Sequence, residues 1–251
     1  ACRESGDPVE MGVRLNNLGI IYSKMGDYRQ ELAVYEQALE IFRQTGQQRQ
    51  VAIALNNIAT AYYLLKEPAE ALQHGLESLH LAQEMGLGML EAAALGTVGD
   101  VYRQMDDHPQ ALAYFEQALE LSRRIGFRYI EMVALRSSGQ IWAALGDLDQ
   151  AIALLEQSES LAVEIETKAD RFECHRLLAD VHEQRGDFAA ALCHFRRYHE
   201  LKEEVFNEEA DRRLKNLQSI RGAETAHPSR RLPLSQPCGR IGGAHTRDHL
   251  I

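Results

Sequence analysis

The chain has 251 residues, of which 45% are hydrophobic and 25% are charged, and its formal net charge is −10. The last 31 residues carry a net charge of +3, so the preceding 220 carry about −13 by difference, which argues against a nucleic-acid-binding surface on this larger part. No apolar run approaches the roughly 18 residues that a membrane-spanning helix needs, so we expect no membrane partner and a cytoplasmic location.

A short pattern returns every 40 residues along the chain. One position of the pattern is always small and is occupied by Gly19, Ala59, Gly99, Gly139 and Ala179. Three residues later a large ring follows, in Tyr22, Tyr62, Tyr102, Trp142 and His182. Five matching registers indicate a tandem array in which each repeat buries its apolar surface against its neighbours.

Each repeat is predicted to contain two helices. In the first repeat, apolar residues at helical spacing predict a helix over residues 8–25, and Gly26 is expected to end it, because glycine adopts the left-handed conformation at no steric cost. Asp27 is then expected to cap the second helix, with Gln30 three residues later. Asp107, Asp147 and Asp187 repeat this cap.

The same register sets the expected boundaries of the chain's parts. The array spans residues 1–206, with repeats near residues 8–46, 47–86, 87–126, 127–166 and 167–206. Residues 207–221 extend the last helix, and residues 222–251, rich in proline and glycine, are predicted to be irregular or disordered. Ser5-Gly6 occupies the register that joins repeats, so we expect a fragment of a longer protein whose first helix exposes apolar surface.

These residues resemble the tetratricopeptide repeat family. The matches in the third repeat are Leu95, Val98, Gly99, Tyr102, Ala111, Phe115 and Ala118. The resemblance implies an all-α, right-handed superhelical solenoid of five helix-turn-helix repeats with an extended C-terminal helix. Its 40-residue period is similar to that of arrays in partner-binding adaptors and bacterial signalling proteins.

The resemblance also implies a non-enzymatic scaffold that binds a protein or peptide segment in a concave groove lined by the first helix of each repeat. One expected row contains Asn16, Asn56, Gly96, Arg136 and Arg176, and a second contains Ile20, Thr60, Asp100, Gln140 and Asp180. Asn17 and Asn57 stand where the family often grips a peptide backbone, and an amide can both donate to and accept from such a backbone. Tyr63 and Arg103 lie one turn further along the same face.

The alternative interpretation of these residues is purely structural. The asparagines are then tolerated polar residues, and the arginines pair with Asp100, Asp180 or Glu173 rather than with a partner's carboxylate. The regulatory alternative for the whole chain is the input region of a bacterial signalling enzyme, a diguanylate cyclase or kinase, because residues 206–218 resemble the helix that connects such arrays to output domains.

Two further hypotheses concern metal ions and self-association. Cysteine and histidine are frequent in the fifth repeat, at Cys174, His175, His182, Cys193, His194 and His199. Their spacing along the predicted helices does not bring four ligands to one point, as a zinc site requires. We therefore expect no metal and no other cofactor. Cys238, His245 and His249 in the tail lack a rigid frame. No catalytic fingerprint is present. A homodimer is conceivable through the C-terminal helix or through the exposed first helix.

Overall fold

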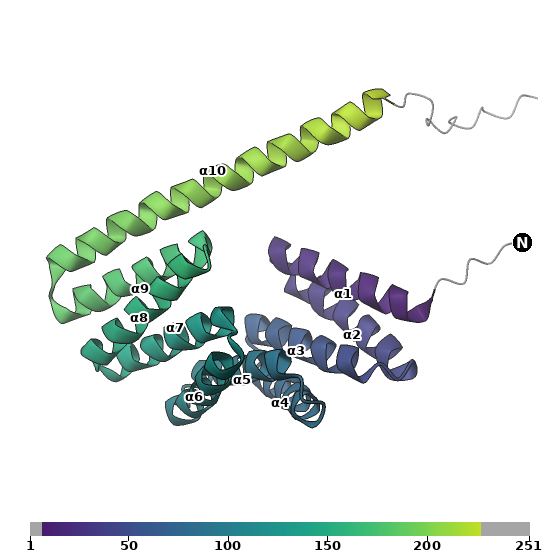
Figure 1. The fold of residues 1–251 in the computed structure, drawn as a ribbon, viewed down its shortest axis with the longest axis horizontal. Helices are drawn as coiled ribbons and strands as arrows, with labels where there is room; N and C mark the ends of the chain where they lie inside the picture. Colours follow the sequence, from purple (N-terminus) through teal and green to yellow (C-terminus); the bar gives the residue numbers. More distant parts are fainter. Residues whose placement is uncertain (1–6, 227–251) are drawn as a thin grey trace, which may run out of the picture. The chain divides into compact units, whose positions relative to one another are not determined.

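The computed structural model describes residues 7–226. In this part of the chain ten α-helices follow one another and no strand is present (Figure 1). Their bounds are α1 (Pro8–Met25), α2 (Tyr28–Gln44), α3 (Gln48–Leu65), α4 (Pro68–Glu84), α5 (Gly88–Gln104), α6 (His108–Ile125), α7 (Arg128–Leu145), α8 (Leu148–Glu164), α9 (Lys168–Arg185) and α10 (Phe188–Ala226). The chain divides into two units, residues 1–205 and 206–251, and the packing described below belongs to the first.

The helices are organised as helical hairpins. We call the odd-numbered helices A helices and the even-numbered ones B helices. From α1 to α8, every helix contacts the helix that follows it. Each hairpin therefore has no closed core of its own and buries its apolar side against the next hairpin. This arrangement confirms the predicted all-α helical solenoid.

Size matching between facing residues brings the two helices of a hairpin close together. A Cβ atom added at Gly99 would lie 2.7 Å from the ring of Phe115, and one added at Gly19 would lie 2.3 Å from the ring of Tyr35. In the second repeat both facing residues are small, Ala59 on the A helix and Gly75 on the B helix, and a Cβ added at Gly75 would lie 3.0 Å from Val98 of α5. In the first, third and fourth repeats the small position of the 40-residue pattern is thus a contact point for a large side chain.

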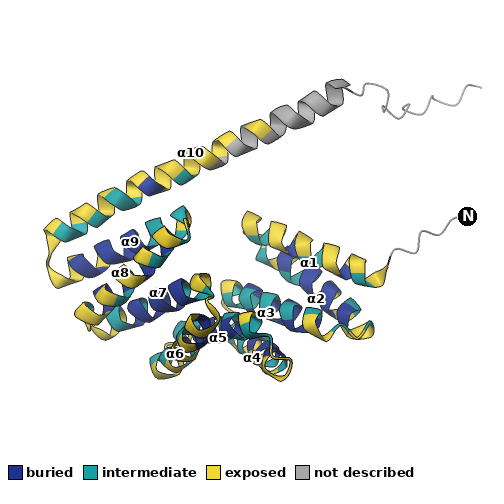
Figure 2. Cartoon of the chain, viewed as in Figure 1, coloured by how far each residue is buried: buried dark blue, intermediate teal, exposed yellow. Residues whose placement is uncertain are grey.

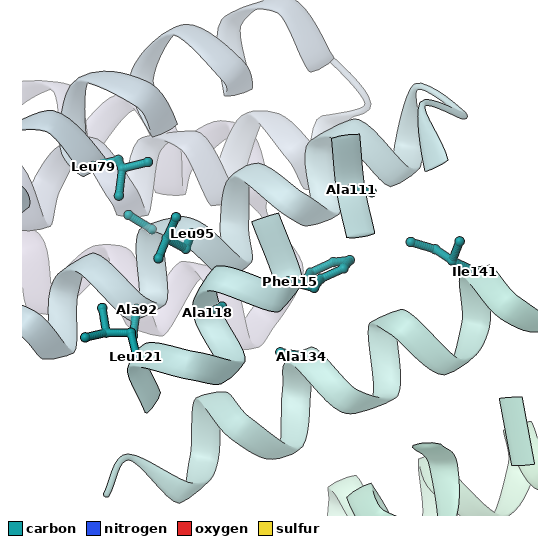
Figure 3. Close-up of a cluster of buried hydrophobic side chains, with 10 residues drawn as sticks. Leu79, Ala92, Leu95, Ala111, Phe115, Ala118, Leu121, Ala134 and Ile141 are labelled. Carbon is teal, nitrogen blue, oxygen red and sulfur yellow. The ribbon is translucent and has the colours of Figure 1, made fainter. Parts of the chain in front are cut away.

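The contact between neighbouring repeats uses small residues on both sides. Ala118 of α6 and Ala134 of α7 are fully or almost fully buried and belong to one apolar cluster that draws on four consecutive helices (Figure 3). One junction further on, the Ser158 hydroxyl donates to the carbonyl oxygen of Met132 at 2.9 Å and lies 3.4 Å from the Cys174 sulfur. Such small contacts allow the helix axes to approach closely.

The predicted helix ends are confirmed. Gly26 adopts a φ of 75° after α1, and Asp27 accepts a hydrogen bond from the backbone N–H of Gln30 at 3.2 Å. Asp107, Asp147 and Asp187 form the same cap at α6, α8 and α10. At the junction between the fourth and fifth repeats, where the glycine is missing, Glu166 itself adopts a φ of 56°.

Both ends of the described chain depart from the internal pattern. On α1 large apolar side chains are exposed, including Met11, Ile21 and Met25, as expected from the sequence (Figure 2). The last helix, α10, ends at Ala226 rather than near residue 221. Gly222 is tolerated within the helix, and the first proline after it is Pro228, so a helix breaker comes only beyond the observed end. Residues 227–251, for which an irregular tail is predicted, lie outside the described residues.

Histidines hold α10 against α9. The Nδ1 atoms of His175 and His194 are 3.0 Å apart, so one ring donates to the other, and His182 stacks on His194 with 5.3 Å between ring centroids. Burial lowers the pKa of His175 from 6.5 to about 4, although the nearby Glu159 carboxylate opposes this shift. Burial also lowers the pKa of His194. Both imidazoles are therefore neutral in the folded protein near pH 7.

Two alanine substitutions on α5 test the size matching. Gly99→Ala is expected to lower the free energy of unfolding, because overpacking against Phe115 costs about 1–3 kcal/mol and exceeds the ~0.5–1 kcal/mol gained by replacing a helical glycine. Gly96→Ala on the same helix is the matched control, since a Cβ there meets nothing within 4 Å. It is expected to raise the free energy of unfolding. Urea denaturation measures both values, and equal changes would contradict the size-matching account.

Acidification tests the buried histidines. Between pH 6.5 and about 4 the unfolded state binds a proton at residue 175 and the folded state does not. The free energy of unfolding therefore falls as the pH is lowered through this window, by up to about 1.4 kcal/mol per pH unit for this group. His175→Gln is expected to flatten the slope. Chemical denaturation at a series of pH values provides the measurement; an unaltered slope in His175→Gln would refute the assignment.

Candidate functional site

The A helices form a continuous row within the first unit. Helix α3 contacts α5, α5 contacts α7 and α7 contacts α9, in addition to the contacts that each makes with B helices. Figure 1 shows the B helices α2, α4, α6 and α8 on the outer side of this row. The expected binding residues all belong to the A helices. We call the side of these helices that carries them the A-helix row.

Two asparagines bridge the first two repeats. The Nδ2 atom of Asn57 donates to Oδ1 of Asn16 at 3.1 Å, so these amides partly satisfy each other. Asn17, which was predicted to share the role of Asn57, is exposed on α1. The Thr60 hydroxyl donates to the backbone carbonyl oxygen of Asn56 at 3.0 Å. The side-chain oxygen of Asn56 is buried and has no hydrogen-bond partner among the described residues.

A longer network links the second, third and fourth repeats. The guanidinium of Arg103 donates to the Tyr63 hydroxyl at 2.9 Å and to Asp100 at 3.0 Å. Asp100 also accepts from the hydroxyl of Ser137 at 3.1 Å, which links α3, α5 and α7. Burial, followed by the charge of Asp100, raises the pKa of Tyr63, so its hydroxyl remains protonated at physiological pH.

The two expected ligand-binding arginines are already ion paired. Arg136 donates to Asp170 of α9 at 2.7 Å, and both side chains are mostly buried. Burial alone lowers the pKa of Arg136, but the bond to Asp170 outweighs it, and the pKa ends above its usual value. Arg176 pairs with Glu173 and Asp180 on its own helix. The pairing alternative thus describes Arg176 correctly, whereas the partner of Arg136 is Asp170 rather than Asp100.

The far ends of three A helices enclose one pocket. Arg103 of α5, Gln140 of α7 and Asp180 of α9 line it together with Leu155, Leu177 and Val181, and its volume is about 290 Å³. We call it the three-helix pocket. Three of the predicted residues therefore do meet around one open space. Gln140 has no hydrogen-bond partner among the described residues, so its amide remains available.

The sequence interpretation missed Ser137 and Asp170. Ser137 occupies the same column of the repeat as Asn17 and Asn57, so the alignment of repeats alone could have identified it. Asp170 stands near the start of α9, outside the two expected groove rows, and only the packing of α9 on α7 brings it to Arg136. No pattern in a single sequence marks such a pair.

Two observations concern other classes of site. Within residues 7–226 no group of three or more metal-ligating side chains converges, and the tail residues Cys238, His245 and His249 lie outside this range. Of the helices that the structure describes, none has the length and apolar character required to cross a membrane.

Comparison with known proteins identifies similar folds. BtubC from P. vanneervenii is 17% identical, with a TM-score of 0.65 over 97% of this chain and 90% of that one. The Rap conjugation gene regulator of plasmid pLS20 is 15% identical, with a TM-score of 0.70 over 82% of this chain and 57% of that one. A Rap protein complexed with Competence and Sporulation Factor is 19% identical, with a TM-score of 0.62 over 80% of this chain and 66% of that one. No curated protein matches the sequence.

The family assignment comes from the sequence of the repeats. The tetratricopeptide repeat family model matches the chain four times, over residues 10–84, 50–124, 90–162 and 131–204. These overlapping matches advance by about one 40-residue period and together cover most of the chain. The protein therefore belongs to the tetratricopeptide repeat family.

Proposed function

We propose that this chain is a non-enzymatic module that binds a peptide or protein segment along the A-helix row. The observation that carries the proposal is the side-chain oxygen of Asn56, which is buried on α3 without a hydrogen-bond partner among the described residues. Leaving a buried polar atom unpaired costs free energy, and the backbone N–H of a bound segment would relieve that cost.

The surroundings of Asn56 support a backbone ligand. The equivalent position on the neighbouring A helix is Gly96, where a Cβ would meet nothing within 4 Å. A segment could therefore pass close to α5 beside the amide of Asn56. The amide of Gln140, in the three-helix pocket, offers a second donor and acceptor two repeats further along.

The structural neighbours are compatible with this function. The pLS20 Rap regulator is described in complex with the Phr* peptide, and another Rap protein in complex with Competence and Sporulation Factor. Their low sequence identity to this chain supports a shared fold, so the nature of the ligand is part of our proposal. In this chain, a bound peptide segment would be held by the polar side chains of the A-helix row that take no part in its ion pairs.

The continuity of α10 favours a second candidate function, the input region of a bacterial signalling enzyme. The helix passes from the first unit into the second at residue 206 without a break and continues to Ala226. A continuous helix can couple a sensing array to an output domain. The coding DNA beyond the codon for Ile220, read in all frames, tests this candidate: a diguanylate cyclase or kinase domain supports it, and its absence in every frame contradicts it.

The same helix is the basis of a self-association prediction. Phe206 is 70% exposed at the start of the second unit. If a second copy covers the apolar edge of α10, light scattering is expected to give the mass of a dimer for the full chain and of a monomer after deletion from Asn207 onward. A monomer in both cases would refute self-association through this helix.

Peptide selection tests the leading proposal. Peptides selected from a random displayed library against the intact chain are expected to bind the A-helix row, and Asn56→Ala or Gln140→Ala should weaken their binding by about tenfold for each hydrogen bond lost. Gln117→Ala, the same kind of truncation at an exposed position of the B helix α6, is the matched control. Fluorescence polarisation measures the affinities. Failure to select any peptide, or equal effects of all three variants, would contradict the proposal.

A further inference from the structure

A second pocket lies at the other ends of the A helices, about 400 Å³ in volume. Its lining comes from the first two turns of α3 and α5 and from the residues that directly precede α5 and α7. The lining residues are Arg49, Ile53, Leu87, Gly88, Met89, Leu90, Ala93 and Phe127. We call it the first-turn pocket. Only Arg49 among them is charged, and the other side chains are apolar or absent.

Small residues of the third repeat create this space. Gly88 has no side chain, and Ala93 contributes a single methyl group to the pocket wall. The equivalent positions in the fourth repeat are Arg128 and Val133, which are larger. The hollow is therefore a local feature of the third repeat rather than a consequence of the repeated fold. Met89 at its rim is 62% exposed, which leaves apolar surface open to solvent.

Arg49 differs from the other arginines of the row. Arg103, Arg136 and Arg176 are all ion paired within the array. Arg49 is exposed at the pocket, and no ion pair or hydrogen bond to a described residue engages it. No acidic residue lines the pocket. A guanidinium without a partner at the edge of an apolar space suits a ligand that combines an apolar group with an anion.

We propose that the first-turn pocket binds a large apolar side chain of the partner while Arg49 binds a carboxylate next to that side chain. This inference rests on the proposed function and deepens it, because it specifies the chemistry of the recognised segment. The apolar group leaves water on entering the pocket, and the planar guanidinium donates to both carboxylate oxygens in a bidentate arrangement. The carboxylate belongs either to an acidic side chain or to the end of the partner chain.

Three small probes distinguish these sources. N-acetylphenylalanine carries a terminal carboxylate, the dipeptide amide acetyl-Phe-Asp-NH₂ carries a side-chain carboxylate, and N-acetylphenylalaninamide carries none. In the full chain, the amide resonances of Gly88 and Met89 are expected to shift saturably with at least one of the two acids, with dissociation constants on the order of millimolar for molecules of this size. The neutral probe is expected to bind about tenfold more weakly, since it cannot engage Arg49.

Substitutions assign the binding to the pocket. Arg49→Gln should reduce binding of the acids to the level of the neutral probe, while Arg124→Gln, the same change at an exposed position of α6, should leave it unaltered. Ala93→Phe fills the space and should abolish binding of all three probes; its circular dichroism spectrum reports whether it folds. Equal binding of the charged and neutral probes, or no effect of Arg49→Gln, would overturn the proposal even if Ala93→Phe does not fold. Probe binding without selection of any library peptide would leave the pocket assigned and refute the longer groove.

Discussion

The fold depends on one constraint, the matching of small residues to large ones where helices meet. Gly19, Gly99 and Gly139 lie under large side chains of the following B helix, whereas Ala59 and Gly75 of the second repeat are both small and Val98 of the next A helix packs close to Gly75. Because no hairpin encloses its own apolar surface, the array buries a continuous core only through close contacts of this kind along its length. The close approach also brings polar side chains of successive A helices within hydrogen-bond distance, as in the pair Asn16 and Asn57.

The binding role proposed for the A-helix row competes with an internal, structural role for the same atoms. Most of its charged groups are used inside the array: Arg103 binds Tyr63 and Asp100, and Arg136 binds Asp170. Such mostly buried pairs fix the relative positions of neighbouring helices, and breaking one by removing a partner is costly. Among the described residues, the side chains of Asn56, Gln140 and Arg49 retain groups without internal partners, and the proposed binding uses these groups. The proposed binding surface therefore contains fewer residues than the full set of polar residues at the expected groove positions.

The repeat pattern predicted the fold to the level of single helix ends, because glycine ends and aspartate caps act locally and recur at fixed positions. Asp27 and Asp107 cap their helices as expected. The site was only partly predictable. Register places a residue on a helix face, but whether Arg136 meets a ligand or Asp170 depends on the spacing between helices, which periodicity does not encode. The first-turn pocket could not be predicted from the sequence, because it arises from the small residues Gly88 and Ala93 rather than from a reactive side chain.

Hydrogen exchange on the intact chain, with and without a selected peptide, tests most directly whether the A-helix row is the binding surface. Amides on a helix that a ligand covers or stabilises exchange more slowly, because the ligand lowers the population of open states. The account predicts added protection in α3, α5 and α7 that exceeds any in α4 and α6. Protection confined to the B helices α4 and α6, with the A helices unchanged, would contradict it.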